Sequence, residues 1–217
     1  IFLSTSEGKE ENHLKELQEA QIPTVLVNRS TYHANLDQIN WDNANAVYLA
    51  VNHLIELGHR RIAHLLGPSW RAGTQHRLDG FNRGLQEHGI ERRAEYLQNG
   101  DYTAEPDLWR ESTHALLALP EPPTAIVASD DLVAAVVIDT IRQAGLDVPG
   151  DLSVVGIDDQ PIFSFMALTT IRLPVVDAGK RAINLLIKRI QDPHIAPSHI
   201  VLPCMLIERR TSGPLKV

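Results

Sequence analysis

Apolar residues follow two different spacings along this chain. Short continuous apolar runs, such as residues 62–66, alternate with longer stretches in which apolar residues recur every three or four positions, as in residues 42–57. The short runs are typical of strands buried on both faces, and the longer stretches are typical of helices with one apolar face. We predict strands over residues 1–4, 23–28, 61–67, 124–129, 153–158, 169–174 and 199–207, and helices over residues 10–21, 42–57, 75–88, 105–119, 131–144 and 176–191. This alternation indicates an α/β fold with parallel sheets flanked by helices.

Polar residues follow several of these strands directly. The segment HLIELGHRRIAHLLGP, residues 53–68, predicts a helix capped by Gly58 in the left-handed conformation, and then a strand that ends at Gly67-Pro68. The ends at residues 128–131 and 156–159 carry paired acids. Because the carboxyl ends of parallel strands meet at one edge of a sheet, these residues are expected to line a cleft. Capping of the following helix is the alternative role for Asp131 and Asp158.

Composition and charge limit the classes of function that this chain can have. The 217-residue chain is 43% hydrophobic and 22% charged, with a formal net charge of -7 and a single cysteine, Cys204, that we expect to be a buried strand thiol. An acidic surface is unlike those that hold a nucleic-acid backbone, so we expect DNA contacts to come from outside this stretch. Because the chain has a single cysteine and no visible signal segment, we predict a cytoplasmic protein. The sequence contains no apolar run of about 20 residues, the length that a membrane-spanning helix needs.

The chain offers no recognisable catalytic set. It contains no G-x-G-x-x-G or P-loop motif, no H-E-x-x-H motif and no G-x-S-x-G motif. The acid pairs could bind a metal ion, but adjacent aspartates at a helix start point in different directions. We interpret the histidines that stand near one another in sequence as structural or surface groups, namely His59, His64, His194 and His199. We therefore predict a protein that is not an enzyme and has no metal or cofactor.

Motifs in a fixed order cover nearly all of the chain. They include Asp42-Asn43, Gly58-His59, Gly67-Pro68, Arg77-Leu78 with Gly80-Phe81, DLSVVGIDD at residues 151–159, LTTI at 168–171 and LIERRT at 206–211. In this order they resemble the effector-binding domain of the LacI/GalR (lactose-repressor/galactose-repressor) family of bacterial transcriptional regulators. The resemblance implies a two-lobed, type I periplasmic-binding-protein-like fold with three crossings, near Asn40, Pro174 and Ser198. Residues 1–40 and 174–197 would form the N-terminal lobe, and residues 41–173 and 198–217 the C-terminal lobe.

The resemblance also implies further structure before Ile1. The family's domain has two strands and two helices ahead of this point, and a helix-turn-helix head ahead of those. We expect the N-terminal lobe to be incomplete in this sequence and an operator to be bound through the missing head.

The resemblance assigns ligand contacts to particular positions. Arg77 matches an arginine that grips ligand oxygens, and Asp158 matches an aspartate that accepts hydrogen bonds from the ligand. Ser129 stands where asparagine is common, and Asn28 stands where aspartate is common. The remaining candidates are Arg71, Asp130 and Tyr102, with Trp70 and Phe163 as further aromatic candidates and Gly73 in the loop 69–74. Alternatives stay open: Arg77 paired with Asp79, Arg71 in water, and Tyr102 as a core aromatic.

The predicted function follows from the resemblance. A small sugar-like or anionic metabolite would bind between the lobes of a homodimer and change its DNA binding allosterically. The alternative is a periplasmic sugar-binding protein of a transport system, which shares the fold. The ending ERRTSGP, residues 208–214, favours the regulator, and the residues before Ile1 would discriminate between the two.

Overall fold

The structure is a computed structural model, and it describes residues 2–3, 11–28, 36–69, 72–100 and 106–216. The chain forms two compact units, residues 1–42 with 174–203 and residues 43–173 with 204–217. It passes between them after Asp42, after Leu173 and after Pro203. The crossings were expected near Asn40, Pro174 and Ser198. Each unit is described by itself.

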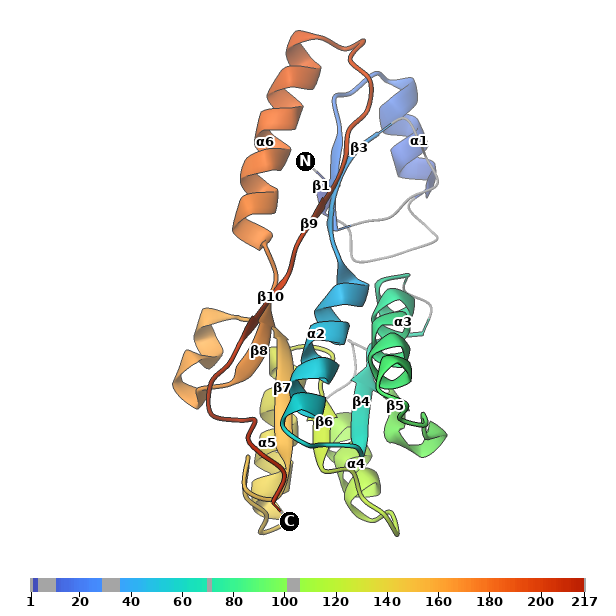
Figure 1. The fold of residues 1–217 in the computed structure, drawn as a ribbon. Helices are drawn as coiled ribbons and strands as arrows, with labels where there is room; N and C mark the ends of the chain where they lie inside the picture. Colours follow the sequence, from blue (N-terminus) through green and yellow to red (C-terminus); the bar gives the residue numbers. More distant parts are fainter. Residues whose placement is uncertain (1, 4–10, 29–35, 70–71, 101–105, 217) are drawn as a thin grey trace. The chain divides into compact units, whose positions relative to one another are not determined.

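The first unit is a parallel sheet flanked by two helices. Its strand order is β1-β2-β3-β9, with β1 Phe2–Leu3, β2 Val25–Val27, β3 Asp37–Trp41 and β9 His199–Leu202. Helices α1 (Glu11–Glu19) and α6 (Val175–Gln191) accompany it (Figure 1). A small apolar cluster of Leu14, Leu26 and Leu36 fills its interior, and Ala178 and Ala182 are the buried residues of α6.

The second unit is larger and contains a six-stranded sheet. The strand order is β10-β8-β7-β6-β4-β5, and only β10 runs antiparallel to its neighbour among the pairs described. The strands are β4 Ile62–Leu66, β5 Leu97–Asn99, β6 Ala125–Val127, β7 Ser153–Asp158, β8 Thr169–Arg172 and β10 Met205–Ile207. The helices are α2 Asn43–Glu56, α3 Ala72–Glu87, α4 Pro106–Leu117 and α5 Asp131–Gln143, with 3-10 turns η1 Ala94–Tyr96 and η2 Pro161–Met166.

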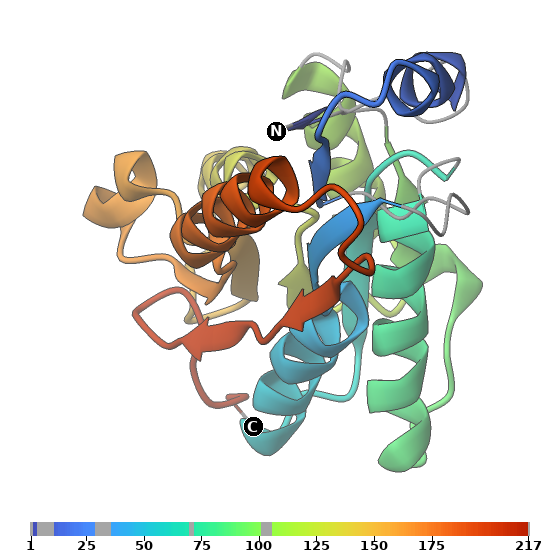
Figure 2. The ribbon, with the colours of Figure 1, turned by 90° about the horizontal axis from the view of Figure 1, so that it is seen from above.

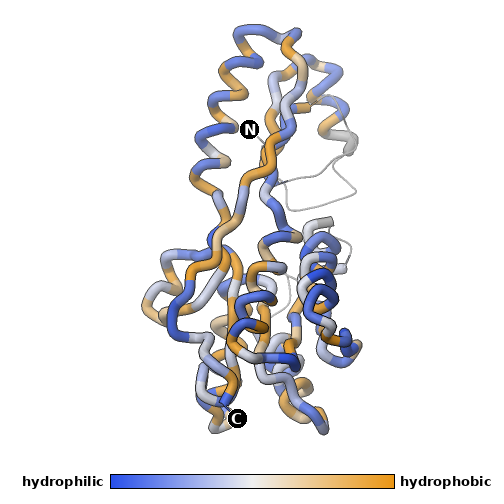
Figure 3. The backbone as a smooth tube through the Cα atoms, viewed as in Figure 1, coloured by the Kyte–Doolittle hydropathy of each residue, from blue (hydrophilic) through white to orange (hydrophobic). Residues whose placement is uncertain are grey.

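Hydrophobic residues concentrate on the central strands of this unit (Figure 3). Alternate residues of β4 face opposite sides of the sheet, so Ala63 and Leu65 join one core cluster while His64 stacks on Phe81 of α3 on the other side. Burying such strands on both faces explains their continuous apolar sequences. The predicted α/β class is therefore observed directly.

Two glycines of α3 allow close packing against α2, and the helices lie side by side (Figure 2). A Cβ atom on Gly80 would lie 1.9 Å from the carbonyl oxygen of Ala44, and one on Gly84 would lie 2.7 Å from Val51 Cγ1. Gly80 belongs to the Arg77-Leu78-x-Gly80 motif. The glycine of that motif is thus required by helix packing, and it brings Arg77, one turn earlier, against the start of α2.

Several predicted boundaries were wrong. The run 199–207 is two strands, β9 and β10, which belong to different sheets. Cys204 is buried, as predicted, but lies in the break between them rather than in a strand. Helix α3 begins at Ala72, so Gly73 is helical and not in a loop. Strand β3, DQINW, was missed because its polar residues Asp37 and Gln38 are buried.

The histidine interpretation is confirmed. His59 is buried, with Nδ1 3.0 Å from Thr124 Oγ1 and Nε2 3.0 Å from both Ser153 Oγ and the Gly213 carbonyl oxygen. His194 and His199 are exposed. Within the described ranges, no three His, Cys, Asp or Glu side chains are grouped to hold a metal ion, and no helix is long and apolar enough to cross a membrane.

Candidate ligand-binding site

Arg77 reaches from α3 to the carboxyl end of β6. Its NH1 donates to the carbonyl oxygen of Ser129 at 2.6 Å, and its Nε donates to Asn43 Oδ1 at 3.2 Å. The side chain is partly buried, and its recorded partners are these two groups instead of Asp79. A guanidinium carries five N–H donors in a rigid fork, so two internal bonds fix its plane and leave it able to donate to a ligand.

Asp158, the last residue of β7, lies close enough to Arg77 to interact with its charge. Burial raises the pKa of Asp158 to about 6, while a 2.9 Å hydrogen bond from Gln160 Nε2 and the positive charge of Arg77 oppose the rise. The nearby carboxylates of Asp130 and Asp131 raise the pKa further. Arg77 and Asp158 therefore lie within electrostatic reach of each other at the strand ends.

Asp130 is the N-cap of α5. Its Oδ1 accepts a 2.8 Å hydrogen bond from the Val133 amide, and its Oδ2 accepts a 3.2 Å bond from Ser129 Oγ. Ser129 is itself fully buried. Both candidates lie at the site, but both side chains are also used to start the helix.

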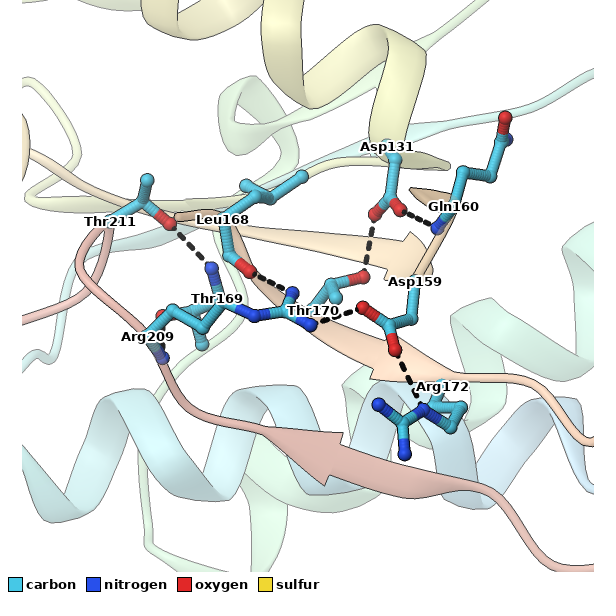
Figure 4. A network of polar contacts seen from close by, with 9 residues as sticks. All are labelled: Asp131, Asp159, Gln160, Leu168, Thr169, Thr170, Arg172, Arg209 and Thr211. Carbon is cyan, nitrogen blue, oxygen red and sulfur yellow. Dashed lines mark hydrogen bonds and ion pairs between the residues drawn. The ribbon is translucent and has the colours of Figure 1, made fainter. Parts of the chain in front are cut away.

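Asp131 does not cap the helix, so that alternative is wrong. It is 1% exposed, and it accepts hydrogen bonds from Thr170 Oγ1 at 2.6 Å and from the Gln160 amide at 2.7 Å (Figure 4). Burial raises its pKa, and the two hydrogen bonds oppose the rise. A Cβ atom on Gly156 would lie 2.5 Å from Asp131 Oδ1, so the glycine of the DLSVVGIDD motif makes room for this carboxylate.

The turn after β7 is held in an unfavourable backbone conformation. Asp158 has φ 123° and Asp159 has φ 57°, both in the positive region that residues with a side chain rarely adopt. Each such residue costs about 1–3 kcal/mol and persists only where its surroundings hold it. Asp159 Oδ2 accepts from Arg172 Nε at 2.6 Å, and Asp159 Oδ1 accepts from Arg209 NH2 at 2.5 Å (Figure 4).

These contacts extend into the C-terminal segment. Arg209 NH1 also donates to the Leu168 carbonyl oxygen at 2.7 Å, and Thr211 Oγ1 accepts from the Thr169 amide at 2.9 Å. Burial raises the pKa of Asp159, but the hydrogen bonds from Arg209 and Arg172 outweigh burial and its pKa lies below the ordinary value. The two arginines therefore favour the ionised form of the Asp159 carboxylate.

The remaining candidate residues do not all lie at the ends of β6 and β7. Asn28 belongs to the first unit, where it is exposed, has φ 53° and donates its amide to the Ile39 carbonyl at 2.8 Å. Phe163 is partly buried in η2, and Gly73 lies beside Asn43. Three candidates fall outside the described residues: Trp70, Arg71 and Tyr102.

Sequence reasoning missed the side chains that support the candidates. Asn43 and Arg209 stand in motifs that were quoted, yet only the folded chain shows which groups they contact. His64 is fully buried beneath this region, and its Nδ1 donates to the Val127 carbonyl oxygen at 2.9 Å. Burial lowers the pKa of His64 to about 4, with Arg77 lowering it further and the bond to Val127 opposing. The ring is therefore neutral at pH 7.

Similarity to known proteins decides the family. Residues 51–212 match the family described as a periplasmic binding protein-like domain. A LacI transcriptional regulator from a Rhodococcus species is 31% identical and superposes with a TM-score of 0.85, covering 98% of this chain and 76% of that one. The chain belongs to the LacI family of transcriptional regulators.

Two further LacI-family relatives add detail. The HTH-type transcriptional repressor CytR of Escherichia coli K12 is 33% identical over 195 residues, which cover 89% of this chain and 57% of CytR. A LacI-family regulator from Enterococcus faecium, determined with bound ribose, is 25% identical with a TM-score of 0.87, covering 99% of this chain and 80% of that one. The chain thus spans little more than half of CytR.

These relatives confirm the resemblance and the fold class drawn from the sequence. They are named as regulators and repressors and not as enzymes, which agrees with the prediction of a non-enzyme. The same names favour a LacI-family regulator over the transport-protein alternative.

Proposed function

We propose that this LacI-family domain binds a small polyhydroxylated or anionic metabolite at the carboxyl ends of β6 and β7 and thereby controls a transcriptional regulator. The observation that carries the proposal is the position of Arg77, which is fixed against Ser129 and Asn43 beside the carboxylate of Asp158. Guanidinium donors and a carboxylate acceptor together match adjacent hydroxyl groups, which both donate and accept. The ribose bound to the relative from Enterococcus faecium is a compound of this class.

The rest of the proposal rests on family membership. The metabolite would lie between two lobes, Asn28, Arg71 and Tyr102 would add contacts, and lobe movement would alter operator binding through a helix-turn-helix head. The active form would be a homodimer. One surface that could serve it combines η2 with α5, because Ile162, Phe165 and Leu132 are 69%, 80% and 58% exposed and large exposed apolar residues favour association.

The test of ligand binding is a thermal-shift screen of sugars, sugar phosphates, sugar acids and nucleosides, with ribose included. A ligand at a hundred times its Kd adds about 2.7 kcal/mol to the free energy of unfolding, which is easily measured. We expect the shift to disappear in Arg77→Ala. A matched control is Arg110→Ala, which removes an arginine paired at 2.7 Å with Asp139 on the surface of the same unit. Equal shifts in Arg77→Ala and in the control would contradict the site.

A further inference from the structure

The chain enters the second unit at Asn43, leaves it after Leu173 and returns at Cys204. Residues close to these crossings are hydrogen-bonded to Arg77 and to Asp159, the neighbour of Asp158. Asn43 itself accepts the hydrogen bond from Arg77 Nε at 3.2 Å. The first crossing is therefore in direct contact with the cationic group of the site.

The chain segments that flank the other two crossings are both bonded to one carboxylate, that of Asp159. Arg172 is the last residue of β8, immediately before the chain leaves the unit, and Arg209 follows β10, the first strand after the chain returns. Both donate to Asp159, whose side chain is 12% exposed. Strands β8 and β10 are also paired, with Met205 opposite Arg172. Asp159 therefore joins the segments that flank two crossings.

Asp159 is adjacent to Asp158, so the ion pairs of Asp159 with Arg172 and Arg209 also constrain the backbone at Asp158. Both residues have positive φ values, so the chain would relax to a commoner conformation if Asp159 were released. Such relaxation would turn the Asp158 side chain away from Arg77. The contacts of Asp131 with Gln160 and Thr170 hold the other side of the same turn.

We propose that Asp159, Arg172 and Arg209 are positioning residues that direct Asp158 toward Arg77 and connect it to two of the chain crossings. This inference rests on the proposed function, since it gives Asp158 its role in ligand binding. Asn43 makes the corresponding connection between the remaining crossing and Arg77.

A positioning role and a purely electrostatic role predict opposite results when the arginines are removed. Loss of two positive charges near Asp158 would raise its pKa, because the ionised form loses favourable interactions. Release of the turn would instead expose Asp158 to water and lower its pKa toward the ordinary value of about 3.9. A role in stability alone would leave the pKa of Asp158 unchanged while the chain stays folded.

The experiment is an NMR titration of the aspartate side-chain carboxyl carbons in the 217-residue chain, without ligand. The variants are the double substitution Arg172→Gln with Arg209→Gln, and the control Arg110→Gln, which breaks the surface ion pair with Asp139. We expect the pKa of Asp158, about 6 in the unaltered protein, to fall by roughly one unit or more in the double variant and to stay unchanged in the control. An unchanged or raised pKa in the double variant would overturn the proposal.

A second variant keeps the test decisive if the double variant loses its native spectrum. Arg172→Gln removes only the more exposed arginine, whose side chain is 52% exposed. The pKa of Asp158 should then fall by a smaller amount in the same direction, and no fall would again overturn the proposal. Because the titration uses no ligand, its outcome is separate from the proposed function, whose failure would appear in the thermal-shift screen.

Discussion

Two neighbouring strands of the second unit each lead into a pair of aspartates, and the pairs differ in the role of their first acid. After β6, Asp130 caps α5 and Asp131 is buried in a structural network. After β7, Asp158 lies near Arg77, whereas Asp159 is held by two arginines. A helix that starts at once uses its first acid as a cap. A strained turn instead needs its second acid as an anchor, which leaves the first available to a ligand.

The largest effect is expected at Asp131. Asp131→Ala would leave the buried Thr170 Oγ1 and the partly buried Gln160 amide without their acceptor. Each unsatisfied buried donor costs about 1–3 kcal/mol, so the free energy of unfolding should fall by about 2–4 kcal/mol in urea denaturation. The paired control is Asp158→Asn, which should change stability at pH 7 little or raise it. Equal destabilisation by both substitutions would remove the distinction between the two pairs.

The next effect is the pH dependence of Asp158. Its folded-state pKa of about 6 lies above the unfolded value of about 3.9, so the folded protein binds the proton more tightly. Its contribution to stability is therefore present below about pH 4 and is lost as pH rises through about 6. Relative to Asp158→Asn, the unaltered protein should lose up to about 3 kcal/mol between pH 4 and pH 7, at 1.36 kcal/mol per unit of pKa. Parallel stability profiles would contradict the buried environment of Asp158.

The smallest effect on stability is expected for Asp130, the N-cap of α5. Asp130→Ala should lower the free energy of unfolding by about 1 kcal/mol, because the Val133 amide loses its partner. Asp130→Ser retains a capping oxygen and should recover most of the loss. Urea denaturation of the two variants measures the difference, and equal losses would show that the cap is not the source of the effect.

The homodimer can be tested separately from the site. Phe165, the most exposed of the apolar residues on η2, is 80% exposed. If η2 and α5 form the dimer surface, Phe165→Asp should convert a dimer to a monomer in analytical ultracentrifugation without loss of secondary structure. Val176→Asp is the control, since Val176 is 73% exposed on α6 of the first unit. A dimer that survives Phe165→Asp would place the interface elsewhere.

Patterning predicted the alternation of helices and strands but missed β3 and β5 and the break between β9 and β10. The apolar run from His199 to Ile207 is continuous in sequence, and only the pairing with β3 and with β8 separates it at Pro203 and Cys204. Strand β3 has few apolar residues, and Asp37 is buried through an ion pair with Arg189 at 3.0 Å. Such a partner is distant in sequence and cannot be read from local spacing.

The site shows the same limit. Arg77 and Asp158 were predicted because they stand in motifs at a helix and at a strand end. The roles of Asn43, Asp131 and Arg209 were not predicted, because they depend on which groups the fold brings into contact with them. Gly80 and Gly156 stand in the quoted motifs, but the sequence did not show why glycine is needed there. A side chain on Gly80 would collide with the Ala44 backbone, and one on Gly156 would collide with the Asp131 carboxylate. Tertiary contacts, rather than residue type, set the different hydrogen-bonding roles of the four aspartates.

The most direct test of the central claim is calorimetric titration with the compound that gives the largest thermal shift. We predict that Arg77→Ala and Asp158→Asn each weaken binding at least about tenfold, equivalent to 1.4 kcal/mol, whereas the surface variant Arg110→Ala, which loses its ion pair with Asp139, binds within about threefold of the unaltered protein. Unchanged affinity in Arg77→Ala and Asp158→Asn would contradict the assignment of the site to the ends of β6 and β7.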